Sequence, residues 1–369
     1  MNKHLNKQLN KQLNKHLKKL FSVILIYCAF TGLIAAAPAL QTINVNNAAQ
    51  LYKAVHQANR SKGATSILLA DGRYNITQRL SFTGSHINLT SMSGDPTLVI
   101  LSGQGMKKSP SAEILIDISG SNISLSGFTL EQSANHLIQV RAEKNADDFS
   151  LSNCVLRDSY EQLLKVSSSS SSKAFADNGS IKNCVFEYTA GVGPQYYIGG
   201  IDAHRSRNWT IVGNTFKNIA SPSQHVAEHA IHFWRKSANI TVLNNTIEDC
   251  DRGIGFGLGD DVNNQTVGGL IANNSISNAN PLHQFTDAGI ILEASPNIEI
   301  SNNKIFIEGH YPNAIEYRFT ATNNIVIKDN VTNKAIVSRD GGQAELSGNQ
   351  QANLLSRVKQ NLKYFIERL

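Results

Sequence analysis

The sequence predicts an all-β fold, a right-handed parallel β-helix, from a repeated unit, a ladder position within it and alternating apolar residues around that position. The ladder position is occupied by Phe128, Cys154, Cys184, Asn214, Asn245, Asn274, Asn303 and Asn330, spaced 26 to 31 residues apart. Apolar residues lie two apart on either side of each Asn, which is typical of short strands that meet at a turn. Stacking such units buries apolar faces that one unit cannot bury alone. An antiparallel sandwich would need hairpin turns, which the sequence does not contain.

The Asn residues suit the corner of each coil for two reasons. Asn tolerates the left-handed backbone conformation of tight turns, and stacked Asn side chains can hydrogen-bond from coil to coil. Cys154 and Cys184 share this column. Neighbouring coils would bring their backbones about 4.8 Å apart, so both a disulfide and two small buried thiols fit.

The first 37 residues predict a secretory signal. They carry six lysines and no acid, followed by an apolar run that ends in Ala35-Ala36-Ala37. An uncleaved anchor is the alternative, although the run is short for one. We therefore expect an exported protein, periplasmic or secreted.

Removing this segment takes away the net positive charge of the chain. The 34 Lys and Arg against 28 Asp and Glu become 28 against 28 once the six lysines are taken away. A nucleic-acid partner then has no electrostatic support.

The mature chain predicts one β-helix domain over residues 38–350, with a short amphipathic helix over 47–59 that covers its first coil. Such a cap protects the open end of a stacked sheet from pairing with other chains. Residues 351–369 predict a basic amphipathic helix. It packs against the last coil or, as the alternative, contacts a membrane surface.

A second strand repeats in each coil and carries most of the chemistry. Alternation turns Ile201, Ile231 and Ile254 inward and the residues between them outward. The outward positions of interest are Lys165, Asp202, His204, His232 and Trp234, followed by Gly253, Gly255 and Gly257. Bare glycines beside ionisable groups predict a groove for a chain-like ligand, and the long loops 188–198, 219–228 and 280–287 would wall it.

Two other chemistries fit less well. Glu228, His229 and His232 differ in order from a His-Glu-x-x-His zinc motif, and strand alternation would turn the two histidines to opposite faces. A metal held by His204 and His232 across coils remains the alternative. Glycoside hydrolysis needs paired carboxylic acids, and only Asp202 is central. We assign no metal or cofactor, with calcium at the loop carboxylates Asp260 and Asp261 as the alternative.

Removal of the C5 proton of a uronic acid suits the predicted site better. It needs a cation that neutralises the carboxylate and a base near C5. Arg235, with Lys165 or Arg205 in reserve, could be the cation and His204 the base. Asp202 would orient the imidazole or raise its basicity.

The segment Asp202-Ala203-His204-Arg205, followed by His229-Ala230-Ile231-His232-Phe233-Trp234-Arg235, resembles the mannuronan C5-epimerases. The rest of the chain resembles the broader pectate-lyase-like β-helix superfamily. The resemblance implies His204 as catalytic base, Asp202 as its partner and Arg235 as carboxylate neutraliser. The epimerases have a Pro where this chain has Ala203 and a Tyr where it has Gly199, so Tyr196 or Tyr197 would have to replace that Tyr.

The sequence thus predicts an enzyme that acts on an anionic, uronic-acid polysaccharide. The expected substrate-binding residues are Lys165, Arg205, His229, His232, Trp234, Arg252, Tyr196 and Tyr197. Epimerisation and lytic cleavage both begin with C5 proton removal, and both stay open. A non-catalytic carbohydrate-binding β-helix is the competing class.

Overall fold

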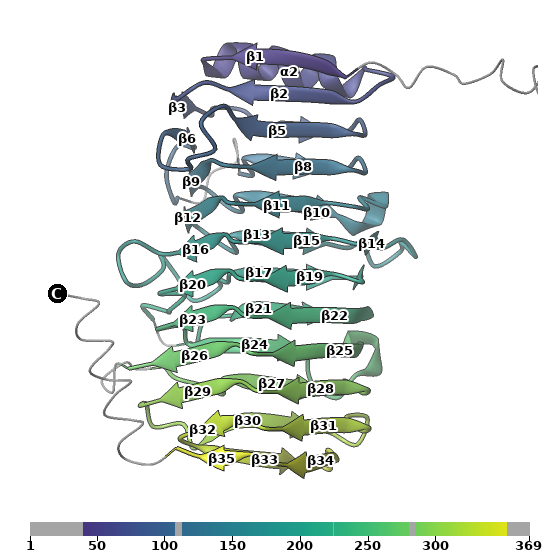
Figure 1. Ribbon diagram of the computed structural model, residues 1–369, viewed down its shortest axis with the longest axis vertical. Helices are drawn as coiled ribbons and strands as arrows, with labels where there is room; N and C mark the ends of the chain where they lie inside the picture. Colours follow the sequence, from purple (N-terminus) through teal and green to yellow (C-terminus); the bar gives the residue numbers. More distant parts are fainter. Residues whose placement is uncertain (1–39, 108–112, 224, 280–284, 353–369) are drawn as a thin grey trace, which may run out of the picture. The chain divides into compact units, whose positions relative to one another are not determined.

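The described part of the protein is a stack of coils, each made of up to three short strands (Figure 1). The computed structural model describes residues 40–107, 113–223, 225–279 and 285–352. The chain divides into two units, residues 1–40 and 41–369, and the coils lie within the second. The predicted signal segment 1–37 lies outside the described residues. So does the predicted C-terminal helix, apart from its first two residues, of which Gln351 belongs to a strand.

Every strand pairing among the described residues is parallel, as coil stacking requires. The first sheet contains β1 (Gln41–Val45), β2 (Thr65–Leu69), β5 (Ile87–Ser91), β8 (Ile123–Ser126), β11 (Ser150–Ser152), β14 (Ala176–Asp177), β15 (Ser180–Lys182), β18 (Ser206–Arg207), β19 (Thr210–Val212), β22 (Ser237–Leu243), β25 (Thr266–Ala272), β28 (Ile298–Ser301), β31 (Ile325–Lys328) and β34 (Ala344–Ser347).

The second sheet carries the candidate site, and we call it the site sheet. It contains β4 (Leu80–Phe82), β7 (Ile116–Ile118), β10 (Ile138–Arg141), β13 (Leu164–Ser167), β17 (Ile201–His204), β21 (His229–Trp234), β24 (Arg252–Phe256), β27 (Ile290–Glu293), β30 (Asn313–Arg318) and β33 (Ala335–Arg339).

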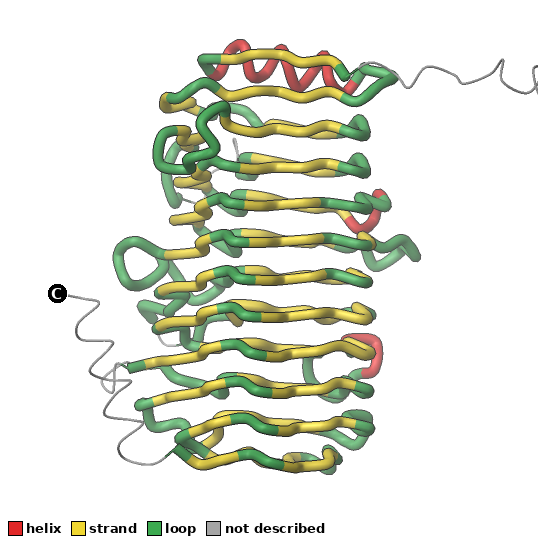
Figure 2. Tube along the Cα trace, in the orientation of Figure 1, coloured by secondary structure: helices red, strands yellow, loops and turns green. Residues whose placement is uncertain are grey.

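The third sheet follows the ladder position in each coil. It contains β3 (Gly72–Asn75), β6 (Val99–Ser102), β9 (Thr129–Ser133), β12 (Val155–Ser159), β16 (Val185–Glu187), β20 (Thr215–Lys217), β23 (Thr246–Glu248), β26 (Ser275–Asn278), β29 (Lys304–Ile307), β32 (Val331–Thr332) and β35 (Gln350–Gln351). Figure 2 shows these strands at corresponding places in successive coils, with loops at the corners.

The predicted helix is present as α2 (Ala48–Asn59). Its N-cap Asn47 accepts a hydrogen bond from the backbone of Gln50, which satisfies a donor that a helix start leaves free. The buried face of α2 contacts β1, β2 and β4 at the first coils. One strand, β1, precedes the helix, which the sequence reasoning missed. Two 3-10 turns, η1 (Ala142–Lys144) and η2 (Val262–Asn264), complete the described helices.

The Asn ladder forms at the corner between the first and third sheets. Oδ1 of Asn274 accepts hydrogen bonds from the backbone N and Nδ2 of Asn245, and Asn303 does the same for Asn274. The left-handed conformation, however, belongs to the residue before each rung, such as Asn244 at φ 55° and Asn273 at φ 58°. The predicted reason for Asn at the rung was therefore half wrong, since its side-chain bonds and not its backbone angle place it there.

The interior follows the predicted alternation. Ile201, Ile231 and Ile254 are paired in register and fully buried, and Phe233 and Phe256 continue the row. Cys154 and Cys184 are buried free thiols. This packed interior fixes which side chains of the site sheet point away from the core.

Candidate functional site

The site sheet brings five predicted site residues together on its outer face. Lys165 is paired with Asp202, Asp202 with His232, and His204 with Trp234 across neighbouring strands. Parallel strands in register place such residues about 5 Å apart although 30 or more positions separate them in sequence.

Asp202 is the centre of these contacts, and we call Lys165, Asp202, His204 and Trp234 the Asp202 cluster. The ammonium of Lys165 forms an ion pair with Oδ2 of Asp202. Trp234 donates from Nε1 to Oδ1 at 2.7 Å. All but Trp234 are buried, with Asp202 at 4% exposure. A buried carboxylate is stable only with such partners.

Both ring nitrogens of His204 have a hydrogen-bond partner. Nζ of Lys165 lies 3.3 Å from its Nε2, and Oγ of Ser168 lies 3.3 Å from its Nδ1. An ammonium group can only donate, so Nε2 accepts and Nδ1 carries the hydrogen. The edge of the His204 ring also packs against Trp234, with centroids 4.4 Å apart.

The protonation states of the cluster follow from burial and charge. Burial raises the pKa of Asp202, but Lys165 and the neighbouring histidines outweigh it and hold that pKa well below its usual value. Burial and then the charge of Lys165 lower the pKa of His204 to about 3, against the opposing effect of Asp202. At neutral pH the cluster therefore contains a carboxylate and a neutral imidazole. The predicted increase in basicity from Asp202 is smaller than these opposing effects.

The two candidate arginines differ in their surroundings. Arg235 follows β21 in the left-handed region, at φ 56°, and its charge contributes to the low pKa of His204. It forms no ion pair within the described residues. The guanidinium of Arg205 lies over the ring of Phe175, 5.5 Å from its centroid. Of the two arginines, Arg235 is the one whose charge acts on His204, and its effect is smaller than that of Lys165.

Position 199, where the epimerases have a tyrosine, is tightly packed in this chain. A Cβ there would lie 3.2 Å from Cγ of Gln162 and from Cβ of Glu228. Burial raises the pKa of Tyr197, and the negative charges of Asp202 and Glu228 raise it further. Its hydroxyl is therefore close enough to feel both carboxylates. Tyr196 instead packs its ring on His225, 4.9 Å away.

The two histidines of β21 lie side by side, contrary to the prediction from alternation. The ring centroids of His229 and His232 are 4.5 Å apart. A Cβ added to Gly255 would meet Nε2 of His229 at 2.6 Å, so this ring lies over the next strand, on the outer face. His229 begins its strand, where the turn of the coil and not the pleat sets the side-chain direction. Burial holds the pKa of His229 well below its usual value.

The predicted glycine floor is therefore not open. His229 fills the space above Gly255, and a Cβ at Gly253 or Gly257 would meet backbone oxygens of the next coil at 2.1 and 1.8 Å. These glycines allow close approach of coils. An open cleft of about 430 Å³ lies further along the stack, beside β27 and β30.

Predicted and unpredicted residues share the walls of this cleft. The lining residues are His229, Arg252, Leu258, Gly259, Asp287, Ile291, Glu293, Tyr311, Glu316, Arg318, Phe319 and Arg339. The acids are paired: Arg252 binds Asp287 at 2.9 Å, and Arg318 and Arg339 bind Glu293 and Glu316 at 2.7 and 2.9 Å. Glu293, Glu316 and Arg318 occupy outward positions of β27 and β30, where two-residue alternation can find them, but nothing along the chain indicates that they share a cleft. Asp287 belongs to the loop 280–287 that the sequence predicted as a wall. The sequence reasoning missed Tyr311 and Arg339, because they lie just before and at the end of a strand.

Calcium at Asp260 and Asp261 gains no support from the local contacts. The carboxylate of Asp261 caps η2 by accepting from the backbone of Asn263 at 2.8 Å. Across the described ranges, the cluster with metal-ligand spacing is Glu228, His229 and His232.

The comparisons with known proteins agree with the stacked coils. The family model described as the right-handed beta helix region matches residues 200–353. The chain is a right-handed parallel β-helix. No curated protein matches it in sequence.

Three solved structures illustrate the likeness. PfbA, a surface adhesin of Streptococcus pneumoniae, is 16% identical with a TM-score of 0.53, over 83% of this chain and 88% of the adhesin. A polygalacturonase from Erwinia carotovora ssp. carotovora is 13% identical with a TM-score of 0.49, over 87% of this chain and 96% of the enzyme. An alginate lyase from Paenibacillus sp. str. FPU-7 is 11% identical with a TM-score of 0.48, over 85% and 98%. At such low identity these likenesses concern the fold alone.

The described residues contain no helix long and apolar enough to cross a membrane.

Proposed function

We propose that this β-helix is exported and acts on a uronic-acid polysaccharide by removing the C5 proton, with His204 as the base. The observation that carries the proposal is the neutral imidazole of the Asp202 cluster, on which the charge of Arg235 acts; Arg235 forms no ion pair with any residue that the structure describes. Deprotonation at C5 needs this pair of a base and a cation.

The step begins with the sugar carboxylate at Arg235. Nε2 of His204 takes the C5 proton, and the electron pair moves onto the carboxylate, where the guanidinium stabilises the added charge. Lys165 donates to the same nitrogen in the free protein, so the substrate must displace that contact. Asp202 then faces the imidazolium at 3.6 Å and stabilises it. Return of a proton from the other face gives the epimer, and loss of the C4 oxygen gives cleavage.

A second function, binding of a polysaccharide without chemistry, has its own support. His204 is 7% exposed and its acceptor nitrogen is occupied by Lys165. The open cleft lies beside β27 and β30 and carries paired charges that hydrogen-bond well to hydroxyl groups. In this case the Asp202 cluster stabilises the sheet.

The deciding experiment incubates the protein with alginate, polygalacturonate and other uronans in deuterated water. Unsaturated ends, seen by ultraviolet absorbance, indicate a lyase, and deuterium at C5 without cleavage indicates an epimerase. We expect His204→Gln to lose about 10²- to 10⁴-fold in rate, as for a general base. The matched control is His225→Gln, an exposed loop histidine outside the cluster.

Two results would overturn the proposal in different ways. Binding of a uronan with neither exchange nor cleavage leaves the non-catalytic function. Full activity of a folded His204→Gln protein removes the assignment of the base while the enzyme remains.

A further inference from the structure

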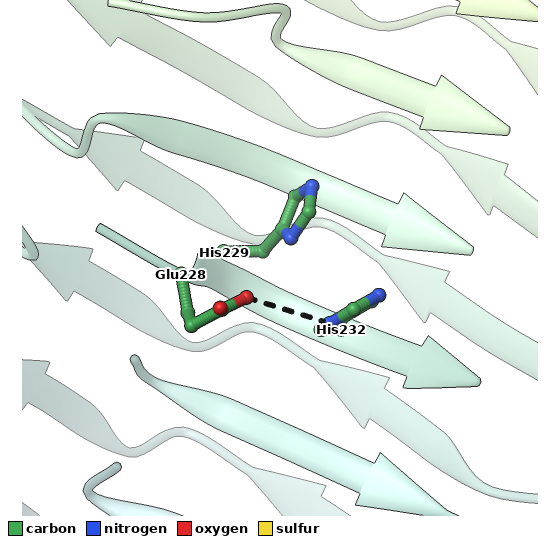
Figure 3. Close-up of side chains that lie close together, drawn as sticks. All are labelled: Glu228, His229 and His232. Atoms are coloured by element: carbon green, nitrogen blue, oxygen red, sulfur yellow. Dashed lines mark ion pairs between the residues drawn. The ribbon is translucent and has the colours of Figure 1, made fainter. Parts of the chain in front are cut away.

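Glu228, His229 and His232 form a cluster at the start of β21 (Figure 3). One carboxylate oxygen and one nitrogen of each ring lie within 4.8 Å of one another. Figure 3 shows the side chains of Glu228 and His232 directed at each other, with Nδ1 and Oε2 4.0 Å apart. The three groups come from one short segment, so a single strand start brings them together.

The hydrogen bond of His232 fixes which of its nitrogens is available. Nε2 lies 2.9 Å from the carbonyl oxygen of Gly257. A carbonyl can only accept, so Nε2 carries the hydrogen and Nδ1 presents a lone pair toward Glu228. Metal-binding histidines usually donate their other ring nitrogen to a carbonyl or carboxylate in this manner.

His229 supplies an independent observation. Its Nδ1 is buried without a hydrogen-bond partner, on a residue that is only 6% exposed. An unsatisfied buried polar atom is costly, by about 1–3 kcal/mol. The ring occupies the space that Gly255 leaves free, since any Cβ there would meet it at 2.6 Å. The fold thus holds an imidazole whose Nδ1 has no hydrogen-bond partner among the described residues, beside a second imidazole and a carboxylate.

We propose that Glu228, His229 and His232 bind a divalent transition-metal ion, and that the ion is zinc. Two imidazoles and one carboxylate are a zinc ligand set that leaves a fourth position open. With zinc–ligand bonds of about 2.0–2.2 Å, the three ligand atoms must lie closer to one another than they do now. Nδ1 of His232 and Oε2 of Glu228 are 4.0 Å apart, and all three ligand atoms lie within 4.8 Å of one another. Glu228 can supply this movement, because its side chain is 29% exposed.

The surroundings favour a cation despite a nearby arginine. Arg252 is neutralised by Asp287 at 2.9 Å. His229 is also a wall residue of the 430 Å³ cleft, so the ion lies next to the space where a ligand of this β-helix could bind. The proposal is independent of C5 chemistry, since it concerns the binding of the metal alone.

The test uses tag-free full-length protein stripped with a chelator and titrated with zinc chloride. We expect one zinc per chain, a melting temperature that rises with zinc concentration, and visible absorption bands of a four-coordinate ion when cobalt replaces zinc. His229→Asn and Glu228→Gln should each weaken zinc binding by more than about 100-fold, beyond the roughly 10- to 100-fold typical of losing an outer partner. Glu228→Gln keeps the shape of a partly exposed side chain and so guards against a folding defect.

His225→Asn is the control, because His225 packs on Tyr196 in the adjoining loop and should leave the affinity unchanged. Absence of stoichiometric zinc in the wild-type protein overturns the proposal. So does zinc binding that both ligand variants retain at full strength, because the ion would then lie elsewhere.

Discussion

The indole nitrogen of Trp234 donates a 2.7 Å hydrogen bond to Oδ1 of Asp202 on the preceding coil. The other oxygen of this carboxylate pairs with Lys165. Coil-to-coil contacts of this kind join residues more than 30 positions apart, and they explain how a regular stack holds an ionised group that is 4% exposed.

Trp234→Phe removes the donor and keeps most of the ring. We expect a loss of about 1–3 kcal/mol in the free energy of unfolding, because the buried carboxylate loses a partner. Urea denaturation measures it. In an Asp202→Ala background, where the side-chain acceptor is gone, the same change should cost clearly less, and equal costs in both backgrounds would contradict a direct bond.

The middle of the Asn ladder should contribute more to the free energy of unfolding than its end does. Asn274→Ala removes two accepted hydrogen bonds and two donated ones, all buried, and should destabilise the fold by about 3 kcal/mol or more. Asn349→Ala, at the partly exposed last rung, should cost less than half as much because water replaces the lost partners. Similar unfolding midpoints for the two variants would show that the ladder adds little.

Acid should destabilise the protein through buried neutral histidines. Burial lowers the pKa of both His136 and His204 to about 3, against about 6.5 in an unfolded chain. Between these values the unfolded state binds protons that the folded state does not, so stability falls as pH decreases. Each residue contributes up to about 1.4 kcal/mol per pH unit.

Urea midpoints at about pH 7 and about pH 5 measure this slope. The unfolded state binds more protons than the folded state in this interval, and His136→Gln should lower that excess by about one proton. Stability that stays flat over this interval would mean that the two imidazoles are protonated in the fold.

Lys165→Gln should raise the pKa of His204, because the ammonium is the largest charge that lowers it. Titration of the His204 ring by nuclear magnetic resonance checks this directly. If His204 is the base, the acid limb of the rate profile should move to higher pH in the same variant, since only the neutral ring accepts a proton. Lys182→Gln, on the exposed edge of β15, is the control.

Gly199→Tyr should not rescue or improve activity. The new Cβ would press on Gln162 and Glu228 at 3.2 Å, so we expect a loss of about 1–3 kcal/mol, with Gly199→Ala milder. Thermal unfolding together with the uronan assay tests this. A folded tyrosine variant with increased turnover would show that the loop carrying Tyr197 moves aside.

The sequence predicted the coil, its register and its interior because these depend on periodicity. The 26- to 31-residue ladder stacked residues such as Ile201 and Ile231, and two-residue alternation placed Asp202 and His204 on the outer face. Both rules hold wherever a strand continues on each side of a residue.

Only the tertiary structure decided what happens at strand ends and between side chains. The ring of His229 turns over Gly255 because the coil bends there, and this places it beside His232. Nε2 of His204 is occupied by Lys165 because two long-range neighbours share one carboxylate. The cleft lies beside β27 and β30, where His229 of β21 and residues of the following coils line it together. These outcomes depend on contacts among three coils at once, and no spacing along the chain records them.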